Sequence, residues 1–127
     1  MEKGIIAVCF ILACIIIEGC GTQSGSAKIN LIQSKYSFGD VKRSNILSHK
    51  FAFINESSDP LFILNAKGSC ECTSIKWPAN SIVQGDTGHI EIQFVPETIG
   101  FNSKTIVVES NTVPAFTVLT IEANVLD

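Results

Sequence analysis

The chain has 127 residues, enough for one domain, and its 12 acidic and 9 basic residues give a formal net charge of −3. The basic residues are scattered singly along the sequence, so the charge pattern of a nucleic-acid-binding protein is missing and we expect no nucleic-acid partner. Hydrophobic residues make up 46% of the chain. An apolar N-terminal segment inflates that share, and the remainder has an ordinary globular composition.

The first 19 residues are typical of a secretory signal peptide. Two charged residues at the start precede the apolar run Gly4–Ile17, which is shorter than the roughly 20 residues that a membrane-spanning helix needs. Cys20 follows Gly19 at the end of this run, an arrangement that resembles the bacterial lipobox, where the cysteine becomes the lipidated first residue. We therefore expect a lipoprotein signal peptide over residues 1–19 and a lipid anchor at Cys20. The alternative is an ordinary or uncleaved secretory signal that leaves Cys20 as a free thiol.

Small polar residues follow Cys20, and residues 20–27 are expected to form a lipidated cysteine and its flexible tether. The tether contains no aspartate and no acidic run. By resemblance to known sorting signals, this favours a lipoprotein of the outer membrane that faces the periplasm. The membrane, reached through Cys20, is thus the first expected partner.

From residue 28 onward the sequence reads as a succession of strands separated by turns. The side chains of Leu47–Asn55 alternate between two faces, and the two phenylalanines identify the buried one. The faces consist of Leu47, His49, Phe51 and Phe53 on one side and of Ser48, Lys50 and Ala52 on the other. Leu61–Ala66 is almost wholly apolar, which predicts a strand covered on both sides or near its ends. The expected strands are Lys28–Gln33, Tyr36–Asp40, Leu47–Asn55, Leu61–Ala66, His89–Val95, Phe101–Glu109 and Ala115–Val125.

About seven short strands with turns every 8–12 residues predict an all-β protein, an immunoglobulin-like antiparallel β-sandwich over residues 28–127. The Cys…Trp…Cys framework of antibody domains is missing from the sequence, so apolar packing has to hold the two sheets together. The expected core consists of Phe38, Phe51, Phe53, Ile92, Phe94, Ile106, Val108, Leu119 and Ile121.

Several short motifs occur in a fixed order between residues 29 and 125. They are Tyr36-Ser-Phe-Gly-Asp-Val41, His49-Lys-Phe-Ala-Phe-Ile-Asn55, Asp59-Pro-Leu-Phe-Ile63, Ser69-Cys-Glu-Cys-Thr73, Gln84-Gly85 and Ser110-Asn111. Together they resemble an uncharacterised family of Bacteroidetes lipoproteins, a domain of unknown function with the hallmark Ser-Cys-Gly-Cys-Thr. The resemblance implies an immunoglobulin-like fold similar to major sperm protein and cilium-associated modules, which mostly bind other proteins, and it implies no catalytic activity. Here Glu71 replaces the hallmark glycine, which raises the question of whether this turn needs a positive φ.

Cys70 and Cys72 are the candidate site residues, and three interpretations remain open. In an extended strand their Cα atoms would lie about 6.6 Å apart on one face, so a disulfide requires a bend between them. Such a disulfide would close a three-residue loop, contribute only about 1.6 kcal/mol to stability, and be readily reduced. Alternatively the two thiolates could bind a soft metal ion with further ligands such as His49 or His89. The third interpretation is that both are small thiols that pack a turn.

The sequence contains no motif that indicates catalysis, so we expect no enzyme, no catalytic residue and no cofactor. The function expected from the fold is a non-enzymatic, lipid-anchored module of the cell envelope that binds a protein partner or has a structural role. Exposed sheet edges would allow recognition by strand addition. The competing hypothesis is a redox-active or soft-metal-binding envelope protein that acts through Cys70 and Cys72.

Overall fold

The structure, a computed structural model, describes residues 26–127. The expected signal peptide at residues 1–19, the lipidated Cys20 and the tether up to residue 25 therefore lie outside the described residues. Ala27, the last residue assigned to the tether, is only 1% exposed and forms a bridge with Thr112. The folded domain thus includes this residue. Within residues 26–127, no helix has the length and apolar character needed to cross a membrane.

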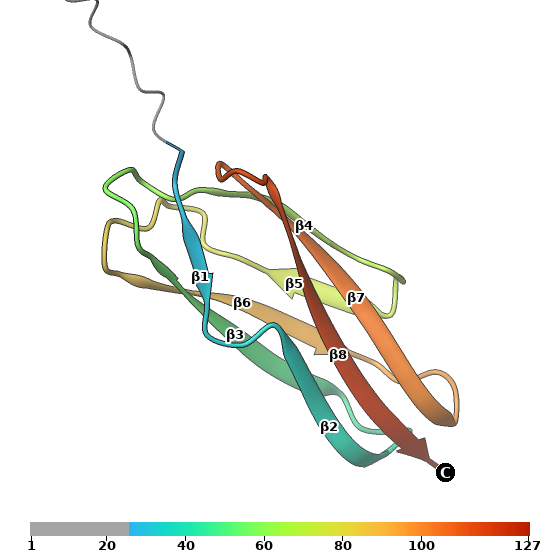
Figure 1. Ribbon diagram of the computed structural model, residues 1–127. Helices are drawn as coiled ribbons and strands as arrows, with labels where there is room; N and C mark the ends of the chain where they lie inside the picture. The colour runs from blue at the N-terminus through green and yellow to red at the C-terminus, as the bar shows by residue number, and fades with distance from the viewer. Residues whose placement is uncertain (1–25) are drawn as a thin grey trace, which may run out of the picture.

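Eight strands form two stacked four-stranded sheets (Figure 1). The first sheet has the order β1-β3-β6-β5, with β1 (Ile29–Leu31), β3 (Leu47–Asn55), β6 (Thr87–Phe94) and β5 (Thr73–Lys76). The second has the order β2-β8-β7-β4, with β2 (Lys35–Lys42), β8 (Phe116–Leu126), β7 (Gly100–Ser110) and β4 (Ile63–Gly68). The immunoglobulin-like β-sandwich is confirmed, and each expected strand overlaps an observed one.

Two features of the topology go beyond the sequence-based expectation. The strand β5 is an additional short element, and it forms one edge of the first sheet. The strand β2 runs parallel to β8, whereas the other neighbouring strands are antiparallel. The chain reaches this position by switching from the first sheet, where β1 pairs with β3, to the edge of the second sheet. Each sheet therefore begins with a strand from the N-terminal segment.

The core lies between the two sheets and is built from alternating side chains. In β3, Phe51 and Phe53 are fully buried, and Ile90, Ile92 and Phe94 of β6 face the same interior. All expected core residues are buried except Phe38, which is half-buried and packs against the cluster from β2. Burial of side chains this large stabilises the domain by roughly 1.5–3 kcal/mol each.

The strand β4 differs from its expected environment. Phe62 just before it is 44% exposed and Leu64 within it is 57% exposed, so the expectation that this segment is covered on both sides is wrong. The pairing of β4 with β7 shifts register between Ile63 and Asn65. A bulge of this kind directs successive side chains to the same side, and both Leu64 and Asn65 are exposed. The outer face of the second sheet therefore carries apolar side chains at its edge.

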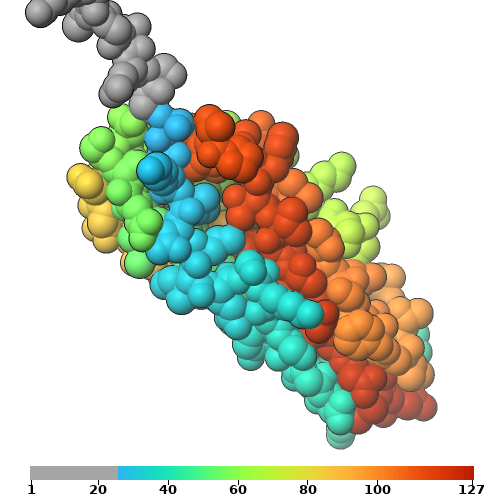
Figure 2. Space-filling view, viewed as in Figure 1, coloured from blue at the N-terminus to red at the C-terminus, as the bar shows by residue number. Residues whose placement is uncertain are grey.

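The two termini of the described chain lie at opposite ends of the sandwich. The described chain begins at the end where β1 starts, and the C-terminus lies at the opposite end (Figure 1). Figure 2 shows β2, β8 and β7 side by side across the outer surface of the second sheet. The yellow-green atoms of the connection between β4 and β5 stand at the margin of this surface.

Candidate functional site

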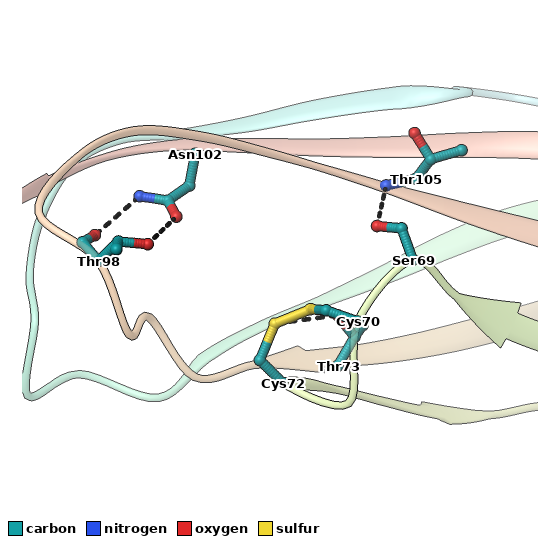
Figure 3. The surroundings of a disulfide bond; sticks show 7 residues. All are labelled: Ser69, Cys70, Cys72, Thr73, Thr98, Asn102 and Thr105. Carbon is teal, nitrogen blue, oxygen red and sulfur yellow. Dashed lines mark hydrogen bonds between the residues drawn. A yellow bond between two sulfur atoms is a disulfide. The ribbon is translucent and has the colours of Figure 1, made fainter.

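The connection between β4 and β5, residues 69–72, joins the edge strand of one sheet to the edge strand of the other. Ser69 extends the β4–β7 pairing, since its N–H donates to Thr105 O at 2.9 Å and its Oγ accepts from Thr105 N at 3.2 Å. At the other end, Val95 N donates to Cys72 O at 3.0 Å, which extends the pairing of β5 with β6. Figure 3 shows the bond between Ser69 and Thr105. With the bond from Val95, the turn is thus fixed to both sheets by groups other than its sulfur atoms.

Within this turn, Cys70 and Cys72 form a disulfide, and their Cα atoms lie 5.3 Å apart. The separation is shorter than the extended value of about 6.6 Å because the chain bends, with Thr73 N donating to Cys70 O at 3.4 Å. Of the three interpretations that the sequence left open, the disulfide is the one present in the structure. A soft metal ion would need both thiolates, and hence the reduced pair.

The presence of Glu71, at a position where the resemblance implies glycine, has a simple structural account. Within residues 26–127, no residue other than glycine has a positive φ. Glu71 therefore adopts this turn without the cost of a left-handed conformation, which is about 1–2 kcal/mol for an ordinary residue. Its side chain is exposed, so the substitution places a carboxylate beside the disulfide.

Thr73 is a member of the site to which the sequence assigned no role. Its Oγ1 lies 3.4 Å from Cys70 Sγ and 4.0 Å from Cys72 Sγ, within reach of a weak hydrogen bond to either sulfur. The absence of a side chain at Gly68 leaves room for this residue, since a Cβ at position 68 would come within 3.1 Å of Thr73 Cβ. The sequence shows only that a threonine follows the cysteine pair, because the position of its hydroxyl depends on how the turn folds.

The two histidines considered as additional metal ligands do not meet at one place. His49 points inward, where its ring stacks on Tyr36 with 3.7 Å between centroids and lies edge-on to Phe51 at 4.7 Å. His89 is exposed on the outer surface of the first sheet. Among the described residues, no three His, Cys, Asp or Glu side chains form a group that could hold a metal ion.

We expect His49 to make the stability of the domain depend on pH. Its Nε2 is buried without a hydrogen-bond partner within residues 26–127, and burial lowers the pKa of His49 below its ordinary value. The unfolded chain takes up a proton near pH 6.5 while the folded domain resists it, so stability should fall as the pH drops below about 6.5. Denaturant unfolding at pH 7.5 and 5.5 measures this loss.

His49→Phe should keep the stack on Tyr36 and remove most of that loss between pH 7.5 and 5.5. The control, His89→Gln, changes the exposed histidine. Its stability should depend on pH in the same way as that of wild type. Equal pH dependence in wild type and His49→Phe would show that His49 is not responsible.

The chain was compared with protein families and known structures. The family model described as "Protein of unknown function (DUF1573)" matches residues 29–125. No curated protein matches the chain in sequence. Among solved structures, a protein of unknown function from Porphyromonas gingivalis W83 is similar over 77% of this chain and 46% of its own, with 12% identity and a TM-score of 0.69. This chain thus spans less than half of that protein.

Two further structures share the fold. The ASH / PapD-like domain 7 of human CEP192 has 12% identity and a TM-score of 0.60, and the match covers 80% of this chain and 87% of that domain. The Vibrio cholerae VesB protease has 9% identity and a TM-score of 0.58, with 81% of this chain and only 32% of the protease covered. At such low identity these similarities establish a shared β-sandwich fold and nothing about activity.

Proposed function

The chain belongs to the family described as proteins of unknown function (DUF1573). We propose that it is a non-enzymatic, lipid-anchored module of the cell envelope that binds an extended protein segment. The observation that carries the binding function is the open edge of β4, which is one of the two edge strands of the second sheet. An edge strand presents unpaired N–H and C=O groups to which another chain can add.

The other three edges are less suited to strand addition. The strands β1 and β5 have only 3 and 4 residues, and short edge strands offer few hydrogen bonds. The strand β2 is divided by a register shift between Ser37 and Asp40, next to Gly39 with a φ of 71°, into two paired segments of three residues. Bulges protect edges because they disturb the row of backbone groups. The bulge in β4, by contrast, lies at its first residues and leaves Asn65–Gly68 regularly paired.

The strand β4 has 6 residues and is flanked by hollows on both sides of its edge. On the outer face, Lys67, Val107 and Phe116 line an apolar depression of about 300 Å³. A second hollow of about 380 Å³ runs along Ala66 and Gly68 toward Ile75 of β5. Because Ser69 N bonds to β7, the alternation of an antiparallel pair turns the N–H groups of Ala66 and Gly68 outward. An added strand could bond to these groups and place its side chains in the two hollows.

The proposed anchor places this edge in the envelope. If lipid is attached at Cys20, the seven residue-to-residue steps from Cys20 to Ala27 span at most about 25 Å. The sandwich would then stand close to the bilayer, with its C-terminal end pointing away from the membrane, since the described chain begins at the opposite end (Figure 1). For an outer-membrane lipoprotein this surface would face the periplasm, where a partner could reach β4.

Cys20→Ser tests the anchor directly. Growth with a palmitate analogue should label wild type and leave Cys20→Ser unlabelled, and the variant should leave the membrane fraction, because acyl chains supply about 0.8 kcal/mol of binding per buried methylene. Cys9→Ser, which changes a cysteine inside the apolar run, should be labelled like wild type. Equal labelling of wild type and Cys20→Ser would overturn the proposed anchor.

A further inference from the structure

The two cysteines of the disulfide are both half-buried, but they have different surroundings. Cys70, together with Lys67, Ser69 and Glu71, lines the hollow of about 380 Å³ between β4 and β5. Cys72 does not line this hollow but packs against the hydrophobic core. A molecule that enters the hollow therefore meets Cys70 first.

The fold holds this turn without relying on the disulfide. The hydrogen bonds of Ser69 with Thr105, and of Cys72 O with Val95, join the turn to both sheets. The disulfide closes a loop with a sequence separation of 2, and loops this short restrict the unfolded chain least. Stabilisation of the fold is thus a poor explanation for the disulfide. Because the disulfide and the fold stabilise each other only weakly, folding also gives the disulfide little protection against reduction.

We propose that the Cys70–Cys72 pair is a site of thiol–disulfide exchange, at which a dithiol reduces the bond by attack on Cys70. In the first step, a thiolate of the dithiol bonds to Cys70 Sγ as the bond between Cys70 and Cys72 breaks. The electron pair passes to Cys72 Sγ, which leaves as a thiolate and takes a proton from water. The second thiol of the dithiol loses its proton and attacks the dithiol's own sulfur in the mixed disulfide. This releases the Cys70 thiolate, which also takes up a proton. The dithiol becomes a disulfide, and two electrons and two protons reside on the cysteine pair.

Thr73 is the positioning residue for this exchange. Its Oγ1 is near both sulfurs, at 3.4 Å from Cys70 and 4.0 Å from Cys72. A hydroxyl in this position can donate a hydrogen bond to the negative charge that spreads over the sulfur atoms during attack. The two charged residues at the hollow, Lys67 and Glu71, have opposite signs, so the net charge beside Cys70 is balanced.

The choice of sulfur is tested on the full chain in which Cys9, Cys14 and Cys20 are replaced by serine, purified in detergent. In this background, Cys72→Ser leaves Cys70 as the only thiol and Cys70→Ser leaves Cys72. The probe is 5,5′-dithiobis(2-nitrobenzoate), whose release of coloured thiolate reports the rate. We expect Cys70 to react about tenfold faster than Cys72 under native conditions, and the two to react equally in denaturant. Native reaction of Cys72 at the same rate as Cys70, or faster, would overturn the assignment.

The exchange itself is tested in the same background with both Cys70 and Cys72 present. Dithiothreitol should reduce the pair while circular dichroism retains the signal of the folded sandwich. Thr73→Val should slow the reduction roughly three- to tenfold, since it removes the hydrogen bond but keeps the shape, and Thr73→Ser should restore it. Reduction that occurs only when the domain unfolds would overturn the proposal. Equal rates for Thr73→Val and Thr73→Ser would overturn the role of the hydroxyl.

Discussion

Replacement of Asn55 by leucine is expected to reduce the free energy of unfolding by at least about 3 kcal/mol, a large part of the stability of a domain this size. Asn55 is fully buried at the end of β3. Its Nδ2 donates to Asp59 O and to Ile82 O, both at 2.8 Å, and its Oδ1 accepts from Ser57 N at 2.9 Å. Leucine has a similar volume but satisfies none of these groups. The side chain joins two loops at the end where the described chain begins, so both should loosen together.

Denaturant unfolding of wild type and Asn55→Leu measures this loss. Asn65→Leu provides the matched control, because Asn65 is exposed on β4 and its replacement should change stability by no more than about 0.5 kcal/mol. A loss below about 1 kcal/mol for Asn55→Leu would mean that water replaces the asparagine and that its hydrogen bonds are dispensable.

The second large effect is expected at the edge of β4, where Leu64→Asp should abolish capture of the protein partner. Leu64 is 57% exposed, so the substitution should leave the fold intact. A strand added to β4 would bring its own side chains beside position 64, where burial of an unpaired carboxylate costs several kcal/mol. At about 1.4 kcal/mol per factor of ten, this loss removes most of the affinity.

Ile46→Asp is the control for that substitution. Ile46 is 68% exposed and lies between β2 and β3, away from the β4 edge. The same charge introduced there should leave capture of the partner unchanged. Capture that persists in Leu64→Asp would exclude the β4 edge as the binding site.

The strands of this domain were predictable because each sheet has one buried face. In β3 and β6 the two-residue alternation of large apolar side chains fixes both the strand and its orientation. The strand β5 was missed because its 4 residues are too few to display a pattern. The exposure of Leu64 was missed because an almost wholly apolar run shows no alternation of apolar and polar residues from which its outward face could be read. The bulge in β4 then changes the alternation from Asn65 onward, and a bulge has no reliable signature in an apolar run. The parallel pairing of β2 with β8 depends on contacts between distant parts of the chain.

The candidate site was only partly predictable. The spacing of Cys70 and Cys72 indicated that a disulfide requires a bend, which is the geometry observed, but it left packing and metal binding as open alternatives. The different surroundings of Cys70 and Cys72 depend on the hollow between β4 and β5 and on the core beneath Cys72. The position of the Thr73 hydroxyl depends on the space above Gly68. These features arise from the meeting of two sheet edges, which local sequence does not specify.

Photo-crosslinking in intact cells tests the proposed binding function most directly. A photoreactive amino acid is placed at Lys67 of β4 or, as a control, at Lys50 on the outer face of the first sheet, since both positions are exposed. We predict a discrete protein adduct in the membrane fraction from position 67, no adduct from position 50, and loss of the adduct when Leu64→Asp is added. Adducts from position 50 alone, or an adduct at position 67 that survives Leu64→Asp, would contradict the account.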